Sequence, residues 1–169
     1  QSLYPGSRIA VRPDERTAVK EGVDFSKIAN NYPVPDSLEI KENFLRMKVN
    51  LKTGHKTGFF LDQSENRLTL SQYCRNKEVI DCFCYTGGFA ISAMLAGARS
   101  ATGIDLDEDA LETAEENARL NSVQVTFQHV NVFDHLRTMT SKGMQADVVI
   151  LDPAKLAGCT EEIKRAHRT

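Results

Sequence analysis

The chain has 169 residues, of which 41% are hydrophobic and 26% are charged, and its formal net charge is −2. This length leaves room for one domain and part of another, and the composition is that of a soluble globular protein. No apolar run approaches the ~20 residues needed to cross a bilayer, so we expect no membrane partner. The charge is uneven, because residues 1–77 carry a net +4 and residues 78–169 a net −6. A basic part beside an acidic part suits a polyanion-facing surface joined to a small-molecule site.

The chain ends and the cysteines bear on the cellular context. The sequence starts without an initiator Met or a signal layout and stops inside a polar helical pattern, so we expect both ends to be cut from a longer polypeptide. The four cysteines show no zinc-ligand spacing. They predict reduced core thiols in a cytoplasmic protein, without a metal site.

Residues 1–66 are predicted to form a small, strand-rich module. Residues 7–12 alternate like a strand, and residues 30–37, with two prolines, form a loop. Short strands joined by turns are expected at 38–40, 44–51 and 57–61. Basic side chains concentrate in this module, where they either contact RNA phosphates or are simply solvated. They are Arg46, Lys48, Lys52, His55 and Lys56.

Residues 67–169 are predicted to form a second domain, introduced by a helix over residues 66–74. Strands and helices alternate through it, which predicts an α/β fold with a parallel, doubly wound, Rossmann-like sheet and right-handed crossovers. The strands are expected at 79–83, 101–105, 123–128 and 146–151, and the helices at 88–96, 107–121 and 133–141.

Polar residues follow the end of each predicted strand in this domain. The turn Thr86-Gly87-Gly88 comes after the first strand, and Asp105, Asn131 and Asp152 follow the next three. Ligands of such sheets bind beyond the carboxyl ends of the strands. We therefore expect these residues to form one site.

The residues of the turn indicate which nucleotide binds. A dinucleotide-binding turn carries G-x-G-x-x-G, but Phe83 and Tyr85 occupy the early glycine positions here, and only Gly87 and Gly88 remain. The P-loop pattern is also absent. Bulky residues argue against a diphosphate, and therefore against an NAD-dependent oxidoreductase. They suit S-adenosylmethionine, whose amino-acid tail and thioether would occupy the turn.

Three further residues are assigned roles toward that cofactor. Asp105 would bind the ribose hydroxyls, as a carboxylate at this position does for adenosine-type ligands. The alternative is a helix-capping role for Asp105, for which Asp107 is better placed. Asp81 would organise the turn or meet the ammonium group, and Asn131 would read the adenine edge.

Four segments together resemble the bacterial 23S ribosomal RNA cytosine-C5 methyltransferases of the large-subunit methyltransferase I type. They are Gly54-His55-Lys56-Thr57-Gly58-Phe59-Phe60-Leu61-Asp62-Gln63, Asn66-Arg67, Phe83-x-Tyr85-Thr86-Gly87-Gly88-Phe89 and Asp152-Pro153-x-Lys155. The resemblance covers nearly all of the chain, and the first segment is the specific one. Two positions depart from the family pattern: Ser64 replaces an Arg, and Ala154 replaces a Pro.

The resemblance implies a domain order and a set of site residues. In that family a PUA domain comes first, so residues 1–66 would be the small α/β central module and residues 67–169 the N-terminal half of a class I methyltransferase domain. Asp152 would steady the cytosine edge, and Lys155 would hold the base or a phosphate. The nucleophilic cysteine is expected beyond residue 169. The expected cofactor-binding residues are Arg67, Asp81, Phe83, Tyr85, Thr86, Gly87, Gly88, Asp105, Leu106, Asn131 and Asp152.

The resemblance also implies ribosomal RNA as partner, and a homodimer is a further possibility. Two alternatives stay open at this point. One is a guanine-N7 ribosomal RNA methyltransferase with the same turns and no catalytic cysteine. The other is a non-catalytic module that binds S-adenosylmethionine or RNA.

Overall fold

The computed structural model describes residues 22, 24, 34–51 and 58–153. The chain divides into two compact units, residues 1–36 and residues 37–169, and the elements below belong to the second. The predicted strand at 7–12 lies outside the described residues, as do Lys52, His55, Lys56 and Lys155. The predicted domain boundary at 66/67 stays a prediction.

A β-hairpin opens the second unit. Strands β1 (Ser37–Glu42) and β2 (Leu45–Asn50) pair antiparallel, with Ser37 opposite Asn50. Apolar residues alternate with charged ones along β2, so that Leu45, Met47 and Val49 are buried while their neighbours are not. The two strands expected at 38–40 and 44–51 are confirmed.

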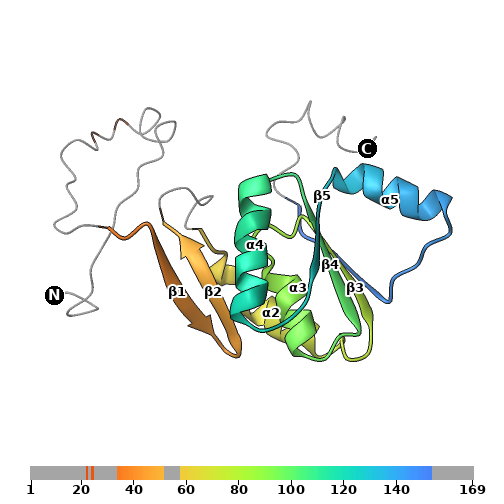
Figure 1. The fold of residues 1–169 in the computed structure, drawn as a ribbon, viewed down its shortest axis with the longest axis horizontal. Coiled ribbons are helices and arrows are strands. Elements are labelled where there is room, and N and C mark those ends of the chain that lie inside the picture. The colour runs from red at the N-terminus through yellow and green to blue at the C-terminus, as the bar shows by residue number, and fades with distance from the viewer. Residues whose placement is uncertain (1–21, 23, 25–33, 52–57, 154–169) are drawn as a thin grey trace. The chain divides into compact units, whose positions relative to one another are not determined.

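The second sheet has four parallel strands in the order β5-β4-β3-β6. They are β3 (Glu78–Cys82), β4 (Ser100–Asp105), β5 (Thr126–His129) and β6 (Val148–Leu151). The second strand along the chain lies beside the first, the third lies outside the second, and the fourth returns to the other side of the first (Figure 1). The order reverses between β3 and β6, the point at which sheets of this kind bind ligands, and it confirms the Rossmann-like α/β fold.

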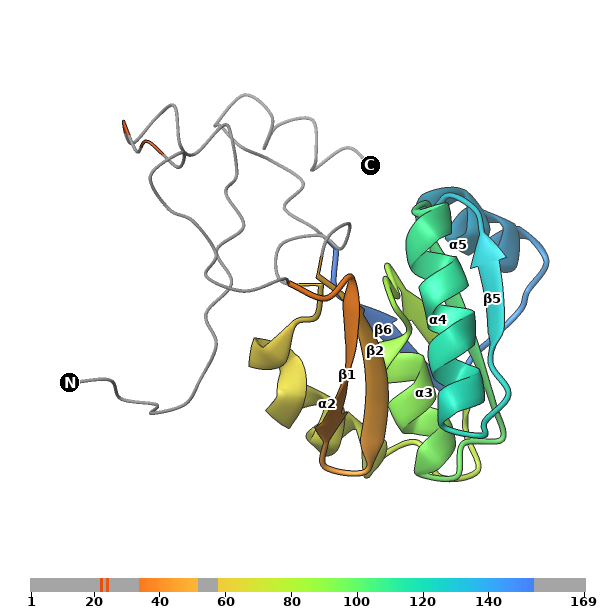
Figure 2. The same cartoon turned by 60° about the vertical axis from the view of Figure 1, so that its left-hand side comes forward.

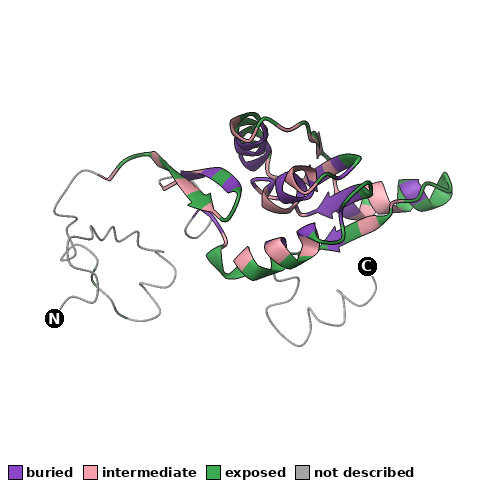
Figure 3. Cartoon of the chain, turned by 90° about the horizontal axis from the view of Figure 1, so that it is seen from below, coloured by how far each residue is buried: buried purple, intermediate pink, exposed green. Residues whose placement is uncertain are grey.

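Helices cover both faces of this sheet. They are α2 (Ser64–Ser71), α3 (Gly88–Leu95), α4 (Glu108–Leu120) and α5 (Val132–Ser141). Helices α3 and α4 lie on the face that also carries the hairpin, and α5 lies on the other face (Figures 1 and 2). Alternate residues of β3 serve the two faces: Val79 packs with Ala90 and Ala93 of α3, whereas Ile80 packs with Val132 and Met139 of α5. Buried residues accordingly concentrate on the strands and on the inner sides of the helices (Figure 3).

The strand predicted at 57–61 is wrong over its described part. Residues 58–60 form a bend, the 3-10 helix η2 (Leu61–Gln63) follows, and α2 begins at Ser64. The reason is a close approach at Gly58, whose φ is +80° and whose Cβ, if present, would lie 2.5 Å from the Asn50 carbonyl oxygen. The chain therefore turns tightly around the end of β2 and buries Phe59 against the hairpin.

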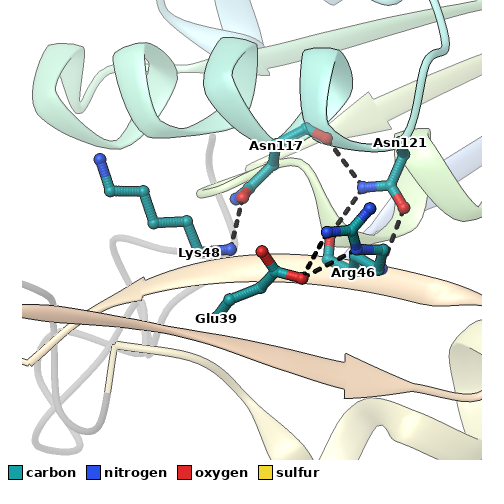
Figure 4. Close-up of polar contacts among 5 residues, drawn as sticks. All are labelled: Glu39, Arg46, Lys48, Asn117 and Asn121. Atoms are coloured by element: carbon teal, nitrogen blue, oxygen red, sulfur yellow. Dashed lines mark hydrogen bonds and ion pairs between the residues drawn. The ribbon is translucent and has the colours of Figure 1, made fainter.

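The hairpin is joined to α4 by side-chain amides as well as by apolar contacts. Asn121 Oδ1 accepts from the Arg46 N–H at 2.9 Å, and its Nδ2 donates to the Arg46 carbonyl at 2.6 Å (Figure 4). Two residues along β2, the Lys48 N–H donates to Asn117 Oδ1 at 2.7 Å. The edge of β2 that does not pair with β1 is thus satisfied by a helix.

Candidate active site

The turn between β3 and α3 has an unusual backbone. Phe83, Tyr85 and Gly87 all have positive φ, at 62°, 48° and 81°. L-residues avoid this region because Cβ meets the backbone, and bulky residues held there concentrate at functional sites. Phe83 and Tyr85 therefore keep the left-handed conformation that glycine normally supplies, while adding aromatic rings to the turn. Their rings meet Phe133 and Phe60 edge to face, respectively.

Asp105, at the end of β4, is bound by three backbone N–H groups. Its carboxylate accepts from Tyr85 at 2.7 Å, from Leu106 at 2.7 Å and from Asp107 at 3.0 Å. The helix-capping alternative for Asp105 is wrong, because Asp107 caps α4 by accepting from the Ala110 N–H at 3.0 Å. Asp105 instead ties the end of β4 to the turn. Leu106 beside it is 59% exposed.

Asp81 is buried beneath the turn, with 1% of its surface exposed. Its Oδ2 accepts from the Ala90 N–H, in the first turn of α3, at 3.0 Å. Burial raises the pKa of this carboxyl from 3.8 to about 7; the Ala90 bond opposes the rise, and the charges of Asp105 and Asp152 add to it. Three acids, Asp81, Asp105 and Asp152, therefore lie at the carboxyl ends of β3, β4 and β6 and form an acidic cluster.

Asp152 follows β6 and is held by the segment before α2. Gln63 Nε2 donates to Asp152 Oδ2 at 3.0 Å, and Asn66 Nδ2 donates to Gln63 Oε1 at 2.6 Å. The second bond fixes which end of the Gln63 amide is the donor. Two segments of the resemblance, one ending in Asp62-Gln63 and one starting at Asp152, thus meet in space.

Two predicted cofactor residues have structural contacts of their own. Arg67 is buried, with Nε and Nη2 each donating to Glu42 at 2.7 Å and its guanidinium 4.4 Å from the Phe59 ring centroid. Asn131 caps α5 by accepting from the N–H groups of residues 133 and 134, at 2.9 and 3.3 Å. Their roles toward a cofactor stay predictions.

The described cysteines are core thiols. Cys74, Cys82 and Cys84 are free and buried. Burial raises the pKa of Cys82 to about 11 and raises that of Cys84 further, so both stay protonated near neutral pH. Over residues 34–51 and 58–153, no group of His, Cys, Asp and Glu side chains is arranged to hold a metal ion. None of the helices within that same part is long and apolar enough to span a membrane.

The two basic residues of β2 have acidic partners. Arg46 lies 2.8 Å from Glu39, and Lys48 lies 2.6 Å from Glu116. These pairs are half-exposed, so they reduce the positive charge of the hairpin without removing it from solvent. RNA contact through this surface stays a prediction.

Sequence reasoning missed Asn117, which is fully buried on α4. Besides accepting from Lys48, it donates through Nδ2 to the Thr86 carbonyl, in the predicted cofactor turn, at 3.2 Å. The available signal was the position of Asn117, three residues after Ala114 and next to Ala118, on the apolar stripe of the helix.

Comparison with known proteins identifies the family. The family described as S-adenosylmethionine-dependent methyltransferase matches residues 28–168. The chain belongs to this family. The membership confirms S-adenosylmethionine as the cofactor predicted from the turn, and it agrees with the strand order of the sheet.

Individual relatives agree with the resemblance drawn from the motifs. A protein of Tolumonas auensis named ribosomal RNA large subunit methyltransferase I is 39% identical over 160 residues, covering 92% of this chain and 39% of that protein. Its namesake from Cronobacter sakazakii is 36% identical over 173 residues, covering 99% and 43%. The resemblance to the large-subunit methyltransferase I type is confirmed. The chain spans about two fifths of the length of these relatives.

A solved structure agrees at the level of the fold. A protein described as a methyltransferase, crystallised with SAH, superposes with a TM-score of 0.69 at 28% identity, covering 77% of this chain and 35% of that chain. The demethylated cofactor in that structure is consistent with the family assignment of this chain.

Proposed function

We propose that the protein transfers a methyl group from S-adenosylmethionine to C5 of a cytosine in large-subunit ribosomal RNA. The observation that carries the proposal is the group of acids at the carboxyl ends of β3, β4 and β6, where Asp105 is bound to the Tyr85 N–H of the turn and the charges of Asp105 and Asp152 act on the buried Asp81. The names of the two relatives support ribosomal RNA as the substrate.

The cluster fits the chemistry of the cofactor. When bound, S-adenosylmethionine supplies a methyl group on a sulfonium, and it carries a second positive charge on its ammonium group. Three neighbouring carboxylates would bind such a cation more strongly than a neutral or anionic nucleotide. Asp81 would meet the ammonium group, Asp105 the ribose hydroxyls, and Asn131 the adenine edge.

Asp152 would act on the base. Cytosine C5 is a poor nucleophile, and it becomes reactive when a cysteine thiolate adds to C6. A carboxyl group at the N3/N4 edge can give a proton to N3 and so neutralise the negative charge that this addition develops. The Gln63 bond holds one oxygen of Asp152. Lys155 would hold the base or a phosphate, and the resemblance places the thiolate beyond residue 169.

Two measurements test the proposal. Calorimetry with S-adenosylhomocysteine should show one site per chain, and an absence of binding would overturn the cofactor assignment. Protein-free 23S ribosomal RNA is then incubated with labelled S-adenosylmethionine and the longest polypeptide that contains this sequence. After digestion, the nucleosides are identified by mass spectrometry.

The modified nucleoside decides among the candidates. Labelled 5-methylcytidine that disappears in Asp152→Asn supports the proposal. Labelled 7-methylguanosine would replace the cytosine assignment with the guanine one. Binding without transfer would make the protein a cofactor-binding or RNA-binding module. The cytoplasmic location and the homodimer stay predictions, the latter checked by gel filtration.

A further inference from the structure

A buried amide connects the hairpin to the turn of the candidate site. Asn117 has no exposed surface, and its side chain makes one bond in each direction. Its Oδ1 accepts from the Lys48 N–H of β2 at 2.7 Å, and its Nδ2 donates to the Thr86 carbonyl at 3.2 Å. A buried amide that loses either partner leaves a polar group without compensation. Asn117 is therefore satisfied only while the hairpin and the turn both stay in place.

On the hairpin side, residues one turn apart on α4 and its C-cap bind alternate residues of β2. Asn117 and Asn121 are four residues apart on α4, and their partners Lys48 and Arg46 are two residues apart on β2 (Figure 4). Four helical residues rise about 6 Å, and two strand residues rise about 6.6 Å. The match continues at Thr113, whose Oγ1 accepts from Asn50 Nδ2 at 3.1 Å.

The turn side is equally constrained. The Thr86–Gly87 peptide has its carbonyl held by Asn117 and its N–H held by the Cys84 carbonyl at 2.8 Å. Gly87 also packs closely on α4, because a Cβ there would lie 3.2 Å from Ala114 Cβ. This peptide leads directly into Gly88, where α3 begins. Its orientation therefore sets the path of the chain at the position predicted for the amino-acid tail of the cofactor.

We propose that Asn117 is a positioning residue that orients the Thr86–Gly87 peptide for the amino-acid tail, and that it makes cofactor affinity depend on the seating of the hairpin. The inference rests on the cofactor assignment in the proposed function. It adds that the hairpin, through the Lys48 N–H, affects the affinity of the site.

Two matched substitutions on α4 test the turn side. Asn117→Asp keeps an oxygen for the Lys48 N–H and removes the donor to Thr86. Asn121→Asp adds the same charge one turn away, keeps an oxygen for the Arg46 N–H, and removes donors to Arg46 and Asn117. Calorimetry on the full chain should show affinity for S-adenosylhomocysteine about five- to tenfold lower in Asn117→Asp, the loss of one hydrogen bond. The affinity of Asn121→Asp should fall less than about twofold.

A tail-free ligand separates positioning from general loosening. Affinity for 5′-methylthioadenosine, which has the nucleoside but no amino-acid tail, should change less than about twofold in either variant. Thermal unfolding midpoints are recorded for both variants, and binding is compared well below them. An equal loss of both ligands, or an equal effect of the two variants, would make Asn117 a structural residue only and overturn the inference.

A second pair of variants tests the hairpin side and replaces the first pair if Asn117→Asp fails to fold. Lys48→Pro removes the N–H that binds Asn117, and Arg46→Pro removes the one that binds Asn121. Both N–H groups face α4, and both substitutions remove one N–H and one surface ion pair, so the two variants are matched. Lys48→Pro should weaken S-adenosylhomocysteine binding more than Arg46→Pro does. Equal binding would overturn the hairpin dependence, whereas failure of the unsubstituted chain to bind would overturn the proposed function instead.

Discussion

Gln63 and Asp152, 89 positions apart in the sequence, are joined by a hydrogen bond of 3.0 Å. Its donor is the Gln63 amide, which Asn66 orients. The bond occupies one oxygen of the carboxylate to which we assign the cytosine edge. Gln63 is thereby a positioning residue for Asp152, and its substitution should affect transfer rather than cofactor binding.

Gln63→Glu should slow methyl transfer while leaving S-adenosylhomocysteine affinity within about twofold. It places a second carboxylate against Asp152, and two neighbouring carboxylates share a proton, which raises the pKa of one of them. Gln63→Glu also removes the amide that donates to Asp152, so the carboxyl group is no longer held at the cytosine edge and the transfer rate at neutral pH should fall about tenfold or more. Gln72→Glu, an exposed substitution just after α2, is the control. Equal rates in the two variants would contradict the positioning role.

Asp81 should give the protein a stability that falls as the pH rises. The pKa of Asp81 is raised to about 7 in the folded protein, so the folded state binds the proton more tightly than the unfolded state does. The resulting stabilisation is fully present below about pH 4, and it is lost as the pH rises through 7. The difference is on the order of 4 kcal/mol. Asp81→Asn keeps an acceptor for the Ala90 N–H and removes the titration. The free energy of unfolding, measured with urea, should therefore fall more steeply with rising pH in the unsubstituted chain than in Asp81→Asn.

Cofactor binding should have the opposite pH dependence. In the proposed function the ammonium group of S-adenosylhomocysteine would bind the ionised form of Asp81, so affinity should rise between about pH 6 and 8 in the unsubstituted chain. It should be flat over this range in Asp81→Asn. Parallel pH profiles in the two proteins would mean that Asp81 does not face the tail.

Replacing only one partner of the buried ion pair between Arg67 and Glu42 should strongly lower the free energy of unfolding. Their side chains are 5% and 11% exposed. Arg67→Met leaves Glu42 buried without its partner and should lower the free energy of unfolding by about 3–5 kcal/mol. Adding Glu42→Leu should recover much of this loss.

An exposed pair provides the comparison. Asp134 and Arg137 are 72% and 64% exposed, so Asp134→Asn should cost less than about 1 kcal/mol. Urea unfolding of five proteins, the unsubstituted chain, Arg67→Met, Glu42→Leu, the double variant and Asp134→Asn, measures both effects. Additive losses in the Arg67 and Glu42 variants would show that the pair is not coupled.

Gly87→Ala should destabilise the protein more than Gly143→Ala. Both glycines have positive φ, so alanine at either position should cost about 1–2 kcal/mol in backbone strain. A Cβ at Gly143 meets nothing within 4 Å, whereas at Gly87 it meets Phe127 at 3.0 Å and Ala114 at 3.2 Å. Crowding should add about 1–3 kcal/mol at Gly87. Equal midpoints of urea unfolding would rule out the crowding.

The parallel, doubly wound sheet could be predicted from the sequence because alternating strands and helices admit few topologies, and the acids after the strands then meet at one edge. Asp107 could also be preferred over Asp105 as a cap, since it directly precedes the acidic first turn of α4. The conformation of residues 58–61 could not be predicted. Their apolar pattern is that of a strand, and only the approach of Gly58 to β2 turns them into a bend.

The partners of the polar residues were the least predictable part. Nothing near Gln63 in the sequence indicates that it lies against Asp152, because the contact depends on how α2 packs beside the sheet. The two bonds of Asn117 likewise join segments 31 and 69 positions away. Local patterns show that such residues are polar, but only the packed structure shows which groups they satisfy.

The match between α4 and β2 has a consequence for how this protein can vary. To extend the contact by one step, the strand needs two more residues and the helix needs four. The strand then rises about 0.6 Å more than the helix at every step. Insertions and deletions should therefore be excluded from both elements in natural variants and should collect in the segments that connect them. An aligned set of homologous sequences should show two gap-free blocks here, fixed in spacing by their shared contact.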